Sequence, residues 1–197
     1  VDLIGGDTTR GPLNICITVF GEIPVRDGHS LALLRSGARA GDDVYVSGTL
    51  GDARLALDAL QGKLVLPAPL LAQARARLEQ PTPRIALGLA LRGVASAAID
   101  VSDGLLGDLR HILKASACGA TIDTAIAIDL IAARAGLKKA AGPSGPLISR
   151  DQQLALVLAG GDDYELLFTA PASARAAVQS ASGAGATPVT RIGRVEP

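Results

Sequence analysis

Residues 94–119 read VASAAIDVSDGLLGDLRHILKASACG and combine three kinds of local structure in one stretch. The apolar run at 94–101 predicts a strand. After it, Leu105, Leu109 and Ile112 recur at helical spacing, which predicts a helix that ends at the last glycine of the stretch. A Ser-Asp-Gly turn joins the two, so the stretch predicts a strand that leads through a polar turn into an amphipathic helix.

Apolar runs and helical spacing of apolar residues also predict further elements on both sides of this stretch. Strands are expected at residues 1–6, 13–23, 43–47, 120–130, 165–169 and 187–195, helices at 52–60, 68–78, 84–91, 149–159 and 175–182, and a loop at 142–145. Strands and helices mix irregularly and do not alternate as a βαβ repeat, so the predicted fold class is α+β with a mixed α/β domain.

A polar, turn-like stretch around residues 25–30 predicts a domain boundary. We expect residues 1–28 to be the remnant of an N-terminal sheet domain and residues 29–197 to form a self-contained α+β domain. The segment at 13–23 is apolar on both faces, as in a strand that is covered on both sides, and it is expected to pair with a second copy of the chain. The chain contains no Met and begins within a predicted strand, so we interpret it as a piece of a longer protein.

The composition disfavours several classes of protein. Lys and Arg number 19 and Asp and Glu number 19, with only two Phe, two Tyr and no Trp, which argues against nucleic-acid binding. No apolar run approaches the roughly 18 residues of a membrane span, so no membrane association is expected. Cys16 and Cys118 lack CxxC spacing and are interpreted as reduced thiols of a cytoplasmic protein, with a disulfide or metal site as the second interpretation.

Three segments place an aspartate in a glycine-containing turn at the end of a predicted strand: GGDTTR at 5–10, DVSDG at 100–104 and GGDDY at 160–164. Asp100 and Ser102 share one face of their strand, and Asp103 begins the following helix. Oxygen ligands of this kind suit Mg²⁺, and a helix N-terminus suits a phosphate. Each aspartate taken alone is explained by capping or turn formation; their recurrence favours a metal and phosphate site.

Other familiar catalytic patterns are missing from the sequence. The GTLG turn at 48–51 lacks the Lys of a Walker A loop, and no Ser–His–Asp or Cys–His set can be assembled around His29 or His111. Arg35 and Arg39 are interpreted either as solvated surface charges or as a phosphate clamp.

Four stretches together resemble the thiamine-monophosphate kinases: GGDTTRGP at 5–12, ALLRSGARAGDDVYVSGTLGD at 32–52, AIDVSDGLLGDLRHILKAS at 98–116 and GGDDYELLF at 160–168. The resemblance extends over nearly the whole chain. The glycine–acid turns are shared more loosely by a superfamily that includes aminoimidazole ribonucleotide synthetase, selenophosphate synthetase and a hydrogenase maturation factor.

The resemblance implies a domain of the aminoimidazole ribonucleotide synthetase-like type that follows a dimerising, ATP-binding N-terminal sheet domain. It implies an Mg²⁺-dependent, dimeric enzyme that transfers the γ-phosphoryl group of ATP directly to thiamine monophosphate. By matching motif, it implies ATP contacts at Gly6, Asp7, Arg35 and Ser102, Mg²⁺ ligands at Asp7, Asp100 and Asp103, and a substrate contact at Asp162.

The sequence departs from the family pattern in two ways. Asp162 occupies a position that is usually Glu, and the family's N-terminal acidic segments and C-terminal tail are not among the 197 residues. We therefore expect the 197 residues alone to be inactive. Two alternatives remain open: another ATP-using enzyme of the same superfamily, and a non-catalytic module built on this fold.

Overall fold

The computed structural model describes residues 2–139 and 146–197. Contacts within the chain divide it into two units, Val1–Leu31 and Ala32–Pro197. The elements follow in the order β1 (Val25–Arg26), β2 (His29–Ser30), β3 (Asp43–Ser47), α1 (Asp52–Leu60), α2 (Ala68–Glu79), α3 (Ile85–Ala90), β4 (Ala97–Val101), α4 (Leu105–Ser116), β5 (Gly119–Ile122), α5 (Thr124–Ala127), η1 (Ile128–Leu130), α6 (Arg134–Lys139), α7 (Arg150–Ala159), β6 (Glu165–Ala170), η2 (Ala172–Ala174), α8 (Arg175–Ala184) and β7 (Val189–Glu196).

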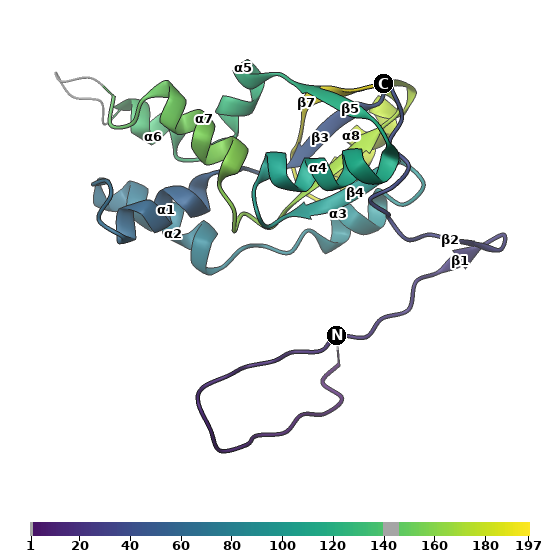
Figure 1. Cartoon of the computed structure of the whole chain (residues 1–197), viewed down its shortest axis with the longest axis horizontal. Coiled ribbons are helices and arrows are strands. Elements are labelled where there is room, and N and C mark those ends of the chain that lie inside the picture. Colours follow the sequence, from purple (N-terminus) through teal and green to yellow (C-terminus); the bar gives the residue numbers. More distant parts are fainter. Residues whose placement is uncertain (1, 140–145) are drawn as a thin grey trace. The chain divides into compact units, whose positions relative to one another are not determined.

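The second unit is built on a five-stranded sheet in the order β4-β6-β3-β7-β5. All neighbouring strands are antiparallel, and the pairing of β3 with β7 shifts register between Val44 and Tyr45. Helices α1, α2, α6 and α7 gather at one end of this sheet (Figure 1). That end is where β3 and β4 finish and β6 begins, so three strand ends meet there.

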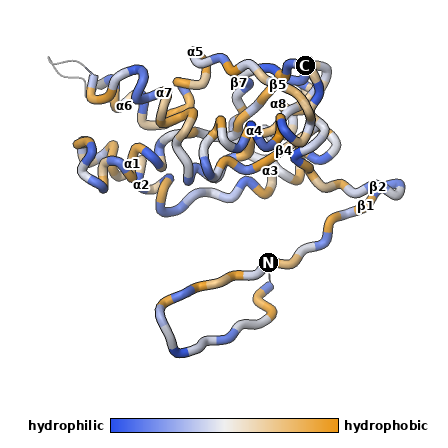
Figure 2. Tube along the Cα trace, in the orientation of Figure 1, coloured by the Kyte–Doolittle hydropathy of each residue, from blue (hydrophilic) through white to orange (hydrophobic). Residues whose placement is uncertain are grey.

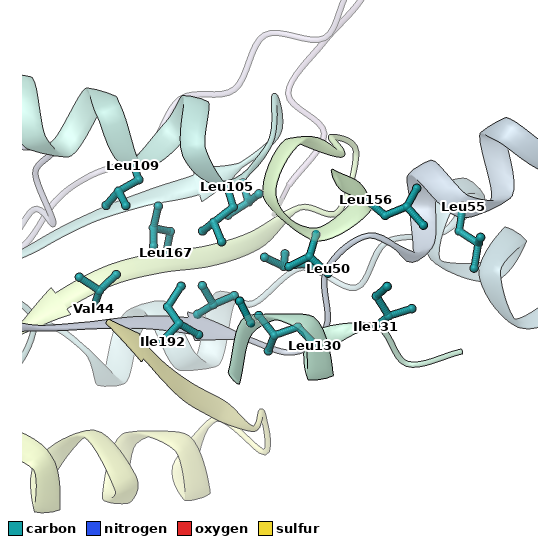
Figure 3. Close-up of a cluster of buried hydrophobic side chains, with 14 of the residues drawn as sticks. Val44, Leu50, Leu55, Leu105, Leu109, Leu130, Ile131, Leu156, Leu167 and Ile192 are labelled. Atoms are coloured by element: carbon teal, nitrogen blue, oxygen red, sulfur yellow. The ribbon is translucent and has the colours of Figure 1, made fainter. Parts of the chain in front are cut away.

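The two faces of the sheet bury two separate apolar clusters. Val44 and Leu167 face the larger cluster, which also contains leucines of the helices α1, α4 and α7 (Figure 3). Tyr45 and Phe168, one residue further along each strand, face the smaller cluster with α3 and α8, and their rings stack with centroids 5.2 Å apart. Successive side chains on a strand point to opposite faces, so the sheet lies between two helical layers.

Most of the predicted elements of this unit are confirmed. The strand at 43–47 and the helix at 52–60 have the predicted bounds, and the helix-forming stripe Leu105, Leu109 and Ile112 is buried. The predicted capping box also forms, because the Ser149 and Gln152 side chains each accept a hydrogen bond from the other residue's backbone N–H. The mixed α/β fold class is therefore confirmed.

The strand predicted at 120–130 is wrong beyond Ile122. The Asp123 carboxylate accepts hydrogen bonds from the N–H groups of Ala125 and Ile126 and so begins α5, which leads directly into η1. The short helix α6 was not predicted. The loop predicted at 142–145 lies outside the described residues.

The strands predicted at 1–6 and 13–23 are also wrong. Residues 2–24 form no helix or strand, although apolar residues recur along them (Figure 2). Leu13 and Ile17 are 92% and 81% exposed. A strand is held by hydrogen bonds to a neighbouring strand, and within the described chain nothing pairs with 13–23. Among residues 2–31, the only strands are the two-residue β1 and β2, joined by a turn at Asp27 and Gly28. Across the described residues, no helix is long and apolar enough to cross a membrane.

Candidate functional site

Two of the three glycine–acid turns lie side by side where β4 ends and β6 begins. The pairing of β4 with β6 places Val101 opposite Glu165. Beyond this pair, the N–H of Asp162 donates to the Ser102 carbonyl at 2.9 Å, and the N–H of Tyr164 donates to the Val101 carbonyl at 2.8 Å. The turns at 100–104 and 160–164 are therefore joined through their backbones.

Gly161 allows these two turns to approach each other. A Cβ atom at position 161 would lie 2.5 Å from the carbonyl oxygen of Ser102, a separation that real side chains do not adopt. The glycine is thus required by the close backbone approach between the turns.

The turn at 102–103 is held from inside by a buried carboxylate. Asp108, in the first turn of α4, is 3% exposed, and its Oδ2 accepts hydrogen bonds from the N–H groups of Ser102 and Asp103 at 3.0 and 3.1 Å. A carboxylate is also favoured there by the positive end of the helix dipole. Asp108 was not among the predicted site residues; the available signal was an acidic residue in the first turn of the helix that follows the Ser-Asp-Gly turn.

The exposed carboxylates Asp100 and Asp103 are the groups at this end of the sheet that suit Mg²⁺. Magnesium in proteins commonly binds one or two carboxylates, with waters and substrate phosphates completing its octahedron. No group of three or more His, Cys, Asp or Glu residues within the described parts of the chain is placed to hold a metal ion. Two exposed carboxylates are donors of the kind that Mg²⁺ accepts where waters and a substrate phosphate supply its other ligands.

The turn at 160–164 alternates between exposed and buried side chains. Asp162 and Tyr164 are exposed, whereas Asp163 and Glu165 are fully buried. Asp162 and Tyr164 also have positive φ angles of 65° and 50°. Such conformations cost about 1–3 kcal/mol each and persist where surrounding contacts hold them, often at functional sites. The buried neighbours of Asp162 are therefore central to the geometry of the turn.

Asp163 ties the turn to the start of α1. Its Oδ2 accepts a hydrogen bond from the N–H of Gly51 at 2.9 Å, and the N–H of Ala53 also donates to the carboxylate. Its Oδ1 is buried without a hydrogen-bond partner. Burial, with a smaller contribution from the neighbouring Asp52 charge, raises the pKa of Asp163 to about 7, against the opposing effects of the two N–H donors and of Arg77.

This raised pKa makes Asp163 a source of pH-dependent stability. Because its folded pKa of about 7 lies above the ordinary value of 3.8, the folded state binds this proton more tightly than the unfolded chain. The stabilisation is therefore complete below pH 3.8 and is lost as the pH rises through about 7. In Asp163→Asn the amide carbonyl still accepts from Gly51, but the group no longer titrates.

We expect the wild type to lose stability relative to Asp163→Asn as the pH rises. The free energy of unfolding of the variant minus that of the wild type should therefore increase with pH. Urea unfolding of both proteins at several values between about pH 4 and pH 8 measures this difference. A difference that stays constant over the range would contradict the assignment.

Glu165 is held by three side chains from three different segments. Its carboxylate accepts hydrogen bonds from Ser47 Oγ at 2.6 Å, from Arg77 Nη2 at 2.6 Å, and from Arg84 Nε and Nη2 at 2.7 and 2.6 Å. The Glu165 carboxylate also lies against Gly48, whose φ is +55°. It occupies the space that a Cβ atom at position 48 would need. Neither Glu165 nor either arginine was among the predicted site residues.

The remaining predicted site residues belong to both units, Gly6 and Asp7 to the first and Arg35 to the second. Gly6 and Asp7 belong to the first unit and are exposed, and Asp7 Oδ1 accepts from the N–H of Thr8 at 2.8 Å. Arg35 is exposed, and its carbonyl accepts from Ser116 Oγ at 3.4 Å, beside the last residue of α4. A 12-residue helix is about 18 Å long, so the Arg35 backbone lies at the opposite end of α4 from the Asp103 turn.

Several proteins similar to this chain are named thiamine-monophosphate kinases. The chain is 44% identical over 199 residues to the thiamine-monophosphate kinase of Salmonella typhimurium, covering 99% of this chain and 56% of that protein. The structure of the thiamine-monophosphate kinase from Stenotrophomonas maltophilia K279a matches with a TM-score of 0.71 at 43% identity, over 87% of this chain and 52% of that one.

A third relative carries ligands. AaThiL complexed with AMPPCP and TMP matches with a TM-score of 0.64 at 31% identity, over 83% of this chain and 48% of that one. The chain thus spans about half the length of the relatives it matches. Residues 39–197 match the family model of the C-terminal domain of AIR synthase related proteins, and the chain therefore belongs to this family.

Proposed function

We propose that the full-length protein phosphorylates thiamine monophosphate to thiamine diphosphate, with ATP as the phosphoryl donor. The observation that carries this proposal is the backbone-joined pair of turns that presents Asp100, Asp103 and Asp162 at one end of the sheet. The 44% identity to thiamine-monophosphate kinase supports it, as does a relative bound to both AMPPCP, an ATP analogue, and TMP.

Direct in-line transfer suits the residues at this site. Phosphoryl transfer requires positioning and neutralisation of spreading negative charge, and it needs no covalent intermediate on the enzyme. We assign Asp100, Asp103 and Asp7 to Mg²⁺, which when bound neutralises charge on the phosphate oxygens. Ser102, Gly6, Asp7 and Arg35 are proposed to contact ATP.

Asp162 is proposed to bind the thiamine moiety. Its exposed carboxylate can accept a hydrogen bond from the amino group of the aminopyrimidine, which leaves the phosphates to Mg²⁺. Asp is shorter than the usual Glu by one methylene. Asp and Asn are also the non-glycine residues that best tolerate positive φ, which is the conformation of Asp162. Because the Asp162 side chain is shorter, its carboxylate reaches the substrate only if the turn places the backbone of this residue close enough.

We also infer a homodimer in the cytoplasm. The apolar side chains of segment 13–23 are exposed and would be covered by a second copy of the chain. Cys16 and Cys118 are both free thiols, as is usual in the reducing cytoplasm. Light scattering of the full-length protein measures the oligomeric state; a monomer at all concentrations would contradict the dimer.

A kinase assay tests the proposed activity. Purified full-length protein with ATP, Mg²⁺ and thiamine monophosphate should form thiamine diphosphate and ADP in equal amounts, measured by chromatography. Turnover only of a substrate from another superfamily enzyme would favour that enzyme. Absence of ATP binding by calorimetry would favour a non-catalytic module.

Asp162→Asn tests the substrate contact. The amide keeps the shape of the side chain and tolerates its positive φ, but it replaces the carboxylate acceptor. We expect the KM for thiamine monophosphate to rise about tenfold, with the KM for ATP unchanged, because the charged hydrogen bond to the substrate is replaced by a weaker one to a neutral amide oxygen. Separate titrations of the two substrates measure this, and an equal effect on both would place Asp162 outside the thiamine site.

A further inference from the structure

The turn that carries Asp162 is tied to α2 by one side chain. Arg77, near the C-terminal end of α2, donates from Nη2 to the carbonyl oxygen of Asp163 at 3.1 Å. The same nitrogen donates to Glu165 Oε1 at 2.6 Å. Arg77 therefore bridges the backbone immediately after Asp162 and the buried carboxylate at the start of β6.

Arg84 offers a matched comparison within the same cluster. It binds the Glu165 carboxylate through Nε and Nη2 at 2.7 and 2.6 Å. The side chains of Arg77 and Arg84 are 16% and 17% exposed. Both arginines therefore bind the same carboxylate and are buried to the same extent. Among the hydrogen bonds of the described residues, Arg84 makes none to residues 160–164.

The conformation of the turn explains why such a bridge has consequences for binding. The residues on either side of Asp163 both have positive φ angles, and neither is a glycine. A strained backbone relaxes when the contacts that hold it are removed. A displacement of about 1 Å in a substrate-binding group can cost up to about a hundredfold in rate, and the short Asp162 side chain leaves little reach to compensate.

We propose that Arg77 is a positioning residue that fixes the Asp162 carboxylate for substrate binding by holding the Asp163 carbonyl. This inference rests on the proposed function and on the assignment of Asp162 to the thiamine site. Arg77 itself does not contact the substrate in this arrangement. Arg77 affects binding because it holds the turn that carries Asp162, whereas Arg84 only stabilises the Glu165 cluster.

The test compares Arg77→Met with Arg84→Met in the full-length protein. Methionine is unbranched and flexible, so it can fill much of the space of the arginine stem. Both variants should lower the melting temperature, because each leaves Glu165 with one arginine fewer. Only Arg77→Met should raise the KM for thiamine monophosphate, by about tenfold, with the KM for ATP unchanged.

The outcomes separate this inference from the function on which it rests. A wild-type protein without thiamine-monophosphate kinase activity overturns both. An active wild type whose KM responds equally to the two variants, or to neither, overturns the role of Arg77 alone. If Arg77→Met does not fold, Arg77→Gln replaces it, because the shorter amide side chain keeps a polar group in the cluster but does not extend as far as the Asp163 carbonyl; an unchanged KM for thiamine monophosphate in that variant overturns the proposal.

Discussion

Asp103→Asn in the full-length protein is expected to lower kcat by about a hundredfold or more, because a neutral amide replaces a carboxylate proposed to hold Mg²⁺. The fold should be unchanged, since the Asp103 side chain is exposed and only its backbone N–H is bound by the buried Asp108. Steady-state kinetics at saturating ATP and thiamine monophosphate, over a range of Mg²⁺ concentrations, measure the effect. Circular dichroism monitors the fold.

Asp151→Asn is the matched control for this substitution. Asp151 is also an exposed carboxylate near the start of a helix, but it lies at the opposite end of α7 from Gly160. It should leave kcat unchanged. Equal losses in the two variants would indicate a general effect of surface charge, and an unaltered kcat in Asp103→Asn would remove Asp103 from the metal site.

The predictable elements of the fold were those with strong local signals. The helix at 52–60 follows a glycine turn and keeps regular apolar spacing, and its predicted bounds are those of α1. The apolar run at 120–130 fits a strand and a helix equally well by composition, and the Asp123 cap decides between them. The run at 13–23 has strand-forming residues, but strand formation depends on a partner that no local pattern supplies.

The same distinction applies to the site. Turns with glycine and aspartate are visible locally, and the structure joins two of them through backbone hydrogen bonds from Asp162 to Ser102 and from Tyr164 to Val101. The residues that hold those turns come from distant segments: Glu165 is 118 positions from Ser47 and 88 from Arg77. Buried charged residues have no periodic signature, so a single sequence does not distinguish Glu165 from an exposed strand end.

Glu165→Gln is expected to cause the largest loss of stability among these substitutions. The carboxylate is fully buried and accepts from Ser47, Arg77 and Arg84. The amide keeps its shape but leaves two largely buried guanidinium groups without a counter-charge. Removing one partner of a buried ion cluster costs about 3–5 kcal/mol, and we expect the free energy of unfolding to fall by that amount. Urea unfolding monitored by circular dichroism measures it.

Glu79→Gln provides the control because it changes the same side chain in an exposed ion pair. Glu79 binds Arg75 one helical turn away on α2, and both side chains are nearly half exposed, at 47% and 46%. Exposed pairs of this kind contribute less than about 1 kcal/mol, because solvent screens the charges and ordering the side chains costs entropy. Equal losses of stability in Glu79→Gln and Glu165→Gln would show that the Glu165 cluster gains nothing from burial. A loss confined to Glu165→Gln would establish the cluster as the main electrostatic support for the end of the sheet where the two turns meet.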